Sequence, residues 1–451
     1  MITVKKGSMT IFLALTVLSF FCFCLVLVEG TRIYFLRVQA MQAMELAEFS
    51  VLSEYQQEAF EKYHLFFLDL DYEQDEESVG ILEQRAKNYL TKNVTELQTK
   101  ALTAKKFHRA TDGGGSVFFE QATEWMKLKS GYVIFEELFA GLEGVQFEEI
   151  NLEQILKEHK NAADGMIAKE NVSDSENLET IVLPDISFPS IRRLTESVLG
   201  NVEDLSKKSI ELSERISKRA LMEGVGQKSK FSITDMQLFH TYIFENCNFY
   251  GAEQTDKWNE SLSYQVEYIV SGKASDRKNL ENILWKVFLL RAGGNYLFYH
   301  QDAGVQAKAQ ADAMALVGFL GNAALIDLVK EIFLISQAIE DGINQTKQIF
   351  AGDKVPIYQN GIFSGVEVGY QEYLYLFLNG MNSTEKIYRT MDVLELEIRN
   401  QSGYEKFRWD HCVDCLELQW IYQFPSLFTG SSVFHGGNYE NTIVRKLYYE
   451  K

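Results

Sequence analysis

The residues best suited to chemistry lie near the carboxyl end of the chain, where Cys412 and Cys415 form its one Cys-x-x-Cys pair and His411 precedes them. Such a pair could supply half of a zinc site, a redox centre or a disulfide. A zinc site needs about four ligands, and no second pair stands at a suitable spacing. A redox pair would begin a helix that follows a strand, which this context does not show. We therefore expect either a local disulfide or two unlinked thiols.

A second group of chemical interest is a run of alternating acidic residues. An EF-hand calcium loop that began at Asp69 would need glycine at its sixth position and glutamate at its twelfth. Those positions hold Gln74 and Gly80, so an EF-hand is rejected. We expect a solvated acidic loop, with a loose surface calcium site as the alternative. The alternation comprises Asp69, Asp71, Glu73, Asp75 and Glu77.

The motifs of common enzymes are missing from the sequence. Its seven histidines are scattered without a His-Glu-x-x-His motif, and neither Gly-x-Ser-x-Gly nor a phosphate-binding Gly-x-x-x-x-Gly-Lys loop occurs. We therefore predict that the protein is not an enzyme and that it has no catalytic residues, no metal site, no cofactor and no small-molecule substrate. A site assembled from residues that are distant in sequence stays open as the alternative.

The amino-acid composition indicates what kind of fold must position these residues. Of 451 residues, 46% are hydrophobic and only 4 are proline, which permits a sizeable core and long unbroken helices. The 63 acidic residues outnumber the 44 basic residues and give a net charge of -19. Because such a surface repels phosphate backbones, the composition argues against nucleic acid as a partner.

Twenty consecutive residues near the amino terminus, from Met9 to Val28, carry no charge. As a helix they would span about 30 Å, the thickness of the hydrocarbon core of a bilayer. We predict an uncleaved signal anchor that crosses the cell membrane once, with a short head in the cytoplasm and the bulk of the chain outside. The alternatives are cleavage after Gly30 or after Gly7, although substrates of a prepilin peptidase usually carry glutamate where this chain has Phe12.

Charged residues follow the apolar run directly. We expect Glu29, Arg32 and Arg37 to lie at the outer membrane boundary and to orient or dock the protein. Apolar residues then recur at three- and four-residue steps to about Phe60, which predicts that the anchor continues as a stalk helix. This helix would either pack on its own domain or offer a packing surface to another subunit, and the pattern does not decide between them.

The exported part is predicted to be α+β and helix-dominated. Helical patterns cover 80–108, 117–145, 194–222, 232–249, 279–299 and 307–348, and a strand pattern covers 416–424. Residues 64–70 are expected to form a short strand or a segment that enters the core, and Asn360-Gly361 indicates a hairpin. The proline-containing interval 160–192 reads as a loop between two lobes. The predicted organisation is a cytoplasmic head at 1–8, a transmembrane helix at 9–28, a stalk helix at 29–62, a first lobe at 63–160, a linker at 161–192 and a second lobe at 193–451.

The segment from Lys5 to Tyr55 resembles the amino-terminal segment of TadE/TadG-like proteins of the tight-adherence (Flp) pilus system. It has a glycine-led apolar span, an acidic residue at the outer end (Glu29), an arginine and then a helix rich in glutamine and alanine. The whole chain is similar to uncharacterised Gram-positive TadE/TadG-related surface proteins. The supporting segments are 62–69, 112–115, 263–280, 311–338, 352–356 and 370–399.

The resemblance implies a role at the cell surface and brings no catalytic residues with it. We therefore expect a structural protein, either a minor pseudopilin or an accessory component of a pilus or adhesion system, with the membrane and other pilus subunits as partners. The alternative is a membrane-anchored extracellular ligand-binding protein or enzyme.

Overall fold

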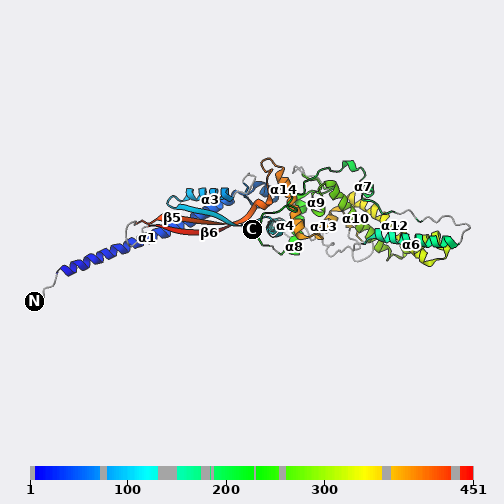
Figure 1. Cartoon of the computed structure of the whole chain (residues 1–451), viewed down its shortest axis with the longest axis horizontal. Coiled ribbons are helices and arrows are strands. Elements are labelled where there is room, and N and C mark those ends of the chain that lie inside the picture. The colour runs from blue at the N-terminus through cyan, green and yellow to red at the C-terminus, as the bar shows by residue number, and fades with distance from the viewer. Residues whose placement is uncertain are drawn as a thin grey trace. The chain divides into compact units, whose positions relative to one another are not determined.

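We analysed a computed structural model of the chain, which describes residues 6–71, 79–130, 150–173, 183, 187–227, 230–252, 261–357, 367–427 and 437–449. The chain forms two compact units (Figure 1). The first, here called the sheet unit, gathers Met1–Glu124, Ala220–Lys230 and Gln401–Lys451, and the second, the helical unit, gathers Trp125–Arg219 and Phe231–Asn400. The predicted lobes were continuous in sequence, whereas both units are assembled from separated stretches.

The predicted anchor and stalk form one helix, α1, from Lys6 to Leu52. Its second half packs on its own sheet through a stripe at three- and four-residue steps, and the stripe comprises Leu36, Ala40, Ala43, Ala47 and Val51. The prediction that the helix reaches residue 60 or 62 is wrong. The backbone leaves the helix after Leu52, and Gln56 starts a separate helix, α2 (Gln57–Tyr63), by accepting a hydrogen bond from the N–H of Ala59 at 2.5 Å.

An antiparallel sheet forms the other layer of the sheet unit. Its central strand β5 (Cys412–Pro425) pairs with β2 (Gln98–Arg109) and with β6 (Asn438–Tyr448), and β1 (Leu68–Asp69) pairs with the start of β5. The buried face of β5 belongs to the same core cluster as residues of α1 and of α3 (Val79–Asn93), and α3 contacts both α1 and β2. This face carries Leu416, Leu418, Trp420, Tyr422 and Phe424.

The strands test three of the sequence predictions. The alternation at 416–424 correctly predicts β5, and the strand expected within 64–70 is confirmed by β1. The single helix expected at 80–108 is wrong beyond Asn93, because Gln98–Arg109 is strand β2. The pairing partner of β2 lies more than 300 residues away in sequence, so local periodicity gives no sign of it.

A glycine-rich turn leads from β2 into α4 (Asp112–Ser130) and ties a distant segment to it. The side chain of Asp112 accepts hydrogen bonds from the backbone N–H groups of Arg109 at 2.9 Å, Gly224 at 2.8 Å and Gly226 at 2.9 Å. A Cβ atom on Gly224 would lie 2.2 Å from the Asp112 carboxylate, so only glycine permits this approach. We call this arrangement the Asp112 clasp. It holds Ala220–Lys230 within the sheet unit.

The helical unit consists mainly of helices, and the long helix at Ala323–Phe350 contacts four of the others. Within the described residues it contains α6 (Leu152–Ser173), α7 (Ile191–Leu199), η1 (Val202–Asp204), α8 (Ile233–Asn246), α9 (Gln265–Ser271), α10 (Asp276–Tyr299), α11 (Ala303–Val317), η2 (Gly318–Leu320), α12 (Ala323–Phe350), α13 (Tyr370–Asn379) and α14 (Ser383–Arg399). The short strands β3 (Val355–Pro356) and β4 (Glu367–Val368) pair antiparallel, and the two-residue hairpin turn expected at Asn360-Gly361 lies outside the described residues and stays a prediction.

Three predictions for the helical unit need correction. The supposed loop at 160–192 begins inside a helix, because α6 runs to Ser173. The helix expected at 194–222 ends at Leu199, where Gly200 adopts a positive φ of 72°. The helix expected at 307–348 is two helices, with a corner at Gly318–Asn322.

The segment after Gly200 is irregular because buried carboxylates accept hydrogen bonds from its polar groups. Asp276 accepts from Ser206, Asp392 from Ser217 and Glu395 from Arg219.

Candidate functional site

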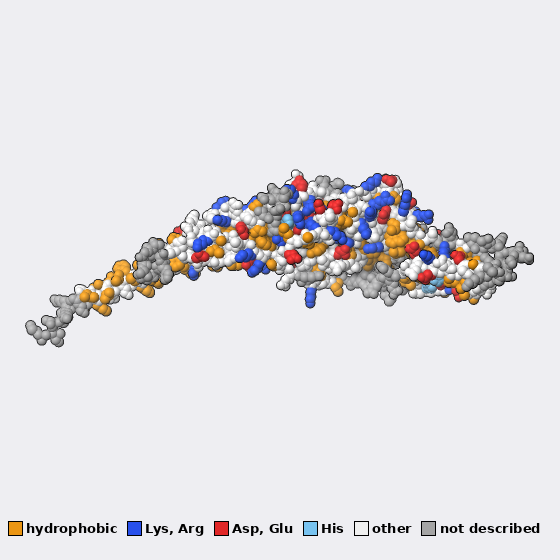
Figure 2. Space-filling model, viewed as in Figure 1, with side chains coloured by type: hydrophobic (Ala, Val, Ile, Leu, Met, Phe, Trp, Pro, Cys, Tyr) orange, Lys and Arg blue, Asp and Glu red, His pale blue; other side chains and the backbone are white. Residues whose placement is uncertain are grey.

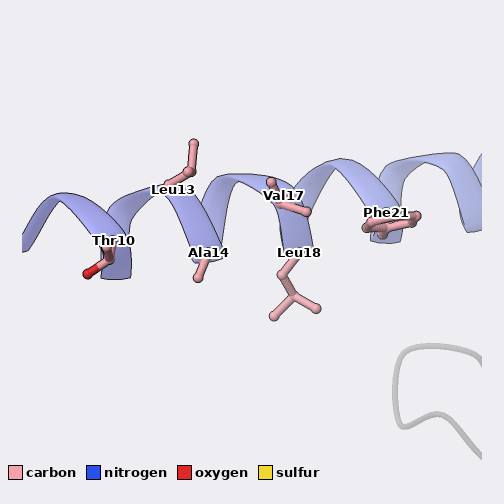
Figure 3. Close-up of a pocket in the computed structure, with 6 residues that line it drawn as sticks. All are labelled: Thr10, Leu13, Ala14, Val17, Leu18 and Phe21. Carbon is pink, nitrogen blue, oxygen red and sulfur yellow. The ribbon is translucent and has the colours of Figure 1, made fainter.

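The apolar half of α1 is the first candidate site. Among the described residues, α1 is the one helix long and apolar enough to cross a membrane. Its hydrophobic side chains lie open on the surface (Figure 2). Figure 3 shows Thr10, Leu13, Ala14, Val17, Leu18 and Phe21 along a hollow that is lined by this helix alone. Such a hollow lacks the second wall that a small-molecule site needs, and the exposed surface suits lipid tails.

The residues predicted to dock the protein lie where the apolar run ends. The carboxylate of Glu29 is buried and accepts a hydrogen bond from the N–H of Leu427, with distances of 3.2 and 3.3 Å to its two oxygens. Arg32 donates to the carbonyl of Pro425 at 2.9 Å and lies 3.9 Å from Glu29. Both residues therefore fasten α1 to the end of β5 within the same chain.

Arg37 does not join this contact. Its side chain is exposed on α1, and its charge opposes the rise in the pKa of Tyr422 that burial causes. The structure thus brings together two of the three boundary residues. Docking of the protein through Glu29, Arg32 and Arg37 stays a prediction, and the buried carboxylate of Glu29 has an internal partner.

We expect Glu29→Ala to loosen the end of β5. The substitution leaves the N–H of Leu427 without its acceptor, which costs about 1–3 kcal/mol locally. Hydrogen exchange of the full chain in detergent micelles should show the Leu427 amide exchanging at least about tenfold faster. The matched control is Glu45→Ala, because Glu45 is half-exposed and lies 3.9 Å from Arg445. If the Leu427 amide exchanged at the wild-type rate and membrane retention were unchanged, Glu29 would not have the role proposed for it at the membrane boundary.

The cysteine motif is the second candidate site. Cys412 and Cys415 are free thiols on the extended strand β5. Three residues of strand separate their Cα atoms by about 10 Å, whereas a disulfide needs less than about 7 Å. The structure therefore shows the two unlinked thiols. Burial raises the pKa of the Cys415 thiol to about 11, so the thiol is protonated at neutral pH and is not an activated nucleophile.

The acidic run and the histidine beside the cysteines meet in a way that the sequence did not indicate. Asp71 contacts the Nδ1 atom of His411, which lies 340 residues later in the chain. Burial raises the pKa of Asp69 to about 7. Glu73, Asp75 and Glu77 lie outside the described residues. Among the residues that the structure describes, no group of three or more His, Cys, Asp or Glu side chains is placed to hold a metal ion.

Sequence reasoning missed a set of buried charges in the helical unit. Glu395 receives two hydrogen bonds from Arg219, at 2.6 and 2.9 Å, and Arg399 lies 3.1 Å away. Lys386 is buried with its Nζ atom 2.7 Å from the Nε2 atom of His240. Glu395 is engaged by other side chains of the unit, so its evident role is to position the chain. A run such as Asp392–Glu397 gives no local sign that its acids are buried.

The fold and these contacts define a helix-dominated α+β protein with one N-terminal helix suited to a membrane. Residues 185–362 and 364–424, more than half of the chain, match a family of unknown function, DUF5702, and the chain belongs to this family. The match covers most of the helical unit and extends through β5 to Phe424. No curated protein and no solved structure matches the chain.

Proposed function

We propose that the protein is a membrane-anchored structural component of the cell surface, either a minor pseudopilin-like subunit or an accessory component of a tight-adherence pilus or adhesion system. In this proposal α1 crosses the membrane once, its amino terminus is cytoplasmic and the two units lie outside. The net charge of -19 then belongs almost wholly to a solvated outer surface.

The observation that carries the proposal is the second exposed face of α1. Beyond the apolar run, this helix buries one stripe against its own sheet and presents another stripe on its opposite side. At a rise of about 1.5 Å per residue the outer stripe extends for about 22 Å past Tyr34. It comprises Tyr34, Phe35, Met41, Leu46 and Phe49, of which Tyr34 is 71% exposed and Phe49 65% exposed. We call it the outer α1 stripe.

An outer stripe of this kind needs a cover, because a row of large apolar side chains in water marks an interaction surface. It continues the membrane-spanning face along the same helix, so a second membrane-anchored helix in parallel orientation would cover both. Helix-on-helix contact of this type needs apolar side chains gathered on one side of the helix, and at 100° per residue the five positions of the stripe fall within an arc of about 140°. The partner is therefore proposed to be another anchored subunit.

We expect Leu46→Glu combined with Phe49→Glu to break this contact while the fold survives, because both side chains are exposed. A photoreactive amino acid at Gln42, on the same face, should cross-link to another membrane-anchored subunit in the native cell. The double substitution should lower the cross-linked product at least about tenfold, because it places two charges in an apolar interface.

The control for this experiment is the same photoreactive group at Thr442, which is exposed on β6 and should give no such product. Unchanged thermal unfolding of the double variant would show that its fold is intact. Absence of a product from Gln42, or an equal amount of product from the double variant, would rule out the outer α1 stripe as the contact surface.

The second candidate function is an extracellular ligand-binding protein anchored by the same helix. It is favoured by one observation, a cleft of about 670 Å³ in the sheet unit. The residues that line the cleft are different from those of the outer α1 stripe. Binding of a ligand in the cleft therefore need not depend on contact of the stripe with another subunit.

A further inference from the structure

The 670 Å³ cleft lies where three strands bring polar side chains to one level of the sheet. The register pairs His108 of β2 with Cys415 of β5, and Cys415 with Tyr448 of β6. Residues directly opposite each other on adjacent strands project from the same face of a sheet. All three line the cleft, together with Glu120 from α4 and Gln227 from the segment that the Asp112 clasp holds.

The walls of this cleft are fixed by hydrogen bonds. The hydroxyl of Ser116 on α4 donates to the carbonyl of Gln227 at 3.0 Å, and the Asp112 clasp holds Gly224 and Gly226 just before it. These contacts join α4 to the segment 224–227. A pre-formed cleft lowers the ordering cost of binding.

The charged residues that line the cleft are of both signs, with two acidic and one basic among them. Glu120 and Asp414 are acidic, Lys446 is basic, and the Nδ1 atom of His108 lies 3.9 Å from a carboxylate oxygen of Asp414. A cleft with mixed charges has no strong net field to draw in a simple ion. It does offer hydrogen-bond acceptors on Glu120 and Asp414, and donors on Lys446 and on the hydroxyl of Tyr448.

The lining of the cleft also includes an aromatic side chain, Tyr448. Tyr448 is 51% exposed, so part of its ring is open to solvent beside the polar groups. A ligand that fits must present many groups able both to donate and to accept, and an apolar C–H face to lie against the ring. Sugars have both properties and carry no charge. We propose that this cleft is a binding site for a neutral saccharide, with Tyr448 against the sugar face and Glu120 accepting from its hydroxyl groups.

The test uses the full chain in detergent micelles and a panel of soluble probes: glucose, galactose, mannose, N-acetylglucosamine and their di- to tetrasaccharides. Saturation-transfer NMR and calorimetric titration should show saturable binding of at least one member. Tyr448→Ala and Glu120→Gln should each weaken that binding about tenfold or more. Val444→Ala is the matched control, because Val444 lies on the same strand outside the cleft lining and should leave the affinity unchanged.

Three results would overturn the proposal: no saturable binding by any saccharide of the panel, binding that both variants leave intact, or displacement of the saccharide signal by glycine or diglycine, which would assign the cleft to zwitterionic ligands. The Leu46→Glu, Phe49→Glu variant keeps this test independent of the proposed function. It should lose its subunit cross-link and still bind the saccharide with wild-type affinity.

Discussion

Replacement of Asp112 with alanine is expected to lower the free energy of unfolding of the sheet unit by roughly 3–5 kcal/mol. Three backbone N–H groups lose a charged acceptor at once, and a hydrogen bond to a charged group contributes about 1.5–3 kcal/mol. The carboxylate is also buried, at 7% exposure, so water replaces it poorly. Thermal unfolding of the full chain should show a lower midpoint for the transition of the sheet unit.

Amide exchange in the segment 224–227 distinguishes loss of the Asp112 clasp from a general loss of stability. Amides of residues 224–227 should exchange with solvent faster in Asp112→Ala than in the wild type, even well below the unfolding temperature. Asp204→Ala is the control, because Asp204 is exposed on η1 and its loss should cost well under 1 kcal/mol. If Asp112→Ala unfolded at the wild-type temperature, the Asp112 clasp would not hold the segment.

The second large effect concerns Lys386, whose replacement with methionine should stabilise the helical unit at neutral pH. Burial lowers the pKa of this amine to about 7 from its ordinary value of 10.5. The unfolded chain therefore holds the proton more tightly than the folded chain does. The resulting cost to stability is fully present below pH 7 and disappears as the pH rises to 10.5, with a size on the order of a few kcal/mol.

The most direct test is how the difference in free energy of unfolding between Lys386→Met and the wild type changes with pH. Chemical unfolding at several pH values between 7.5 and 9.5 should give a higher free energy of unfolding for Lys386→Met than for the wild type. This difference should be largest at the lowest pH and should shrink as the pH rises. Burial raises the pKa of Glu267 to about 7, and this group is present in both proteins, so its contribution cancels. A constant difference across this range would show that Lys386 does not titrate in this way.

Methionine removes a hydrogen bond as well as a charge. The amine of Lys386 contacts the Nε2 atom of His240, and burial holds the pKa of that histidine well below its ordinary value, so its ring is neutral and can accept. Lys386→Arg provides the contrast, because a guanidinium remains charged throughout this range. It should destabilise the unit at every pH tested, since the same apolar site would then hold a permanent charge.

The elements that the sequence predicts well are those whose signal is local. The twenty uncharged residues of α1 and the alternation along β5 need no knowledge of the rest of the chain, and both were correctly predicted. Tyr370, Tyr373 and Tyr375 lie at helical spacing, and all three are buried in α13.

Several of the failures share one physical cause, which is pairing over long sequence separations. Gln98–Arg109 has no strong pattern of its own and becomes a strand because β5 offers it an edge. The irregular segment after Gly200 would otherwise satisfy its polar groups in a helix, and it finds acceptors on α10 and α14 instead. His411 likewise looked like a companion of the cysteines, and its partner is Asp71.

The long sequence separation between α1 and strand β5 affects how the core of the sheet unit forms during synthesis. The stripe from Leu36 to Val51 is synthesised early, and the elements that cover it follow at different times. Helix α3 comes soon afterwards, whereas β5, which completes the same core, begins only at Cys412. At a translation rate of about 5–20 residues per second, the interval between Val51 and Cys412 lasts on the order of tens of seconds. The core of the sheet unit therefore stays incomplete until β5 has been made, whereas the helical unit precedes β5 in the chain. A product that stops short of Cys412 would leave this apolar surface only partly covered, and a surveillance protease could recognise it by that surface.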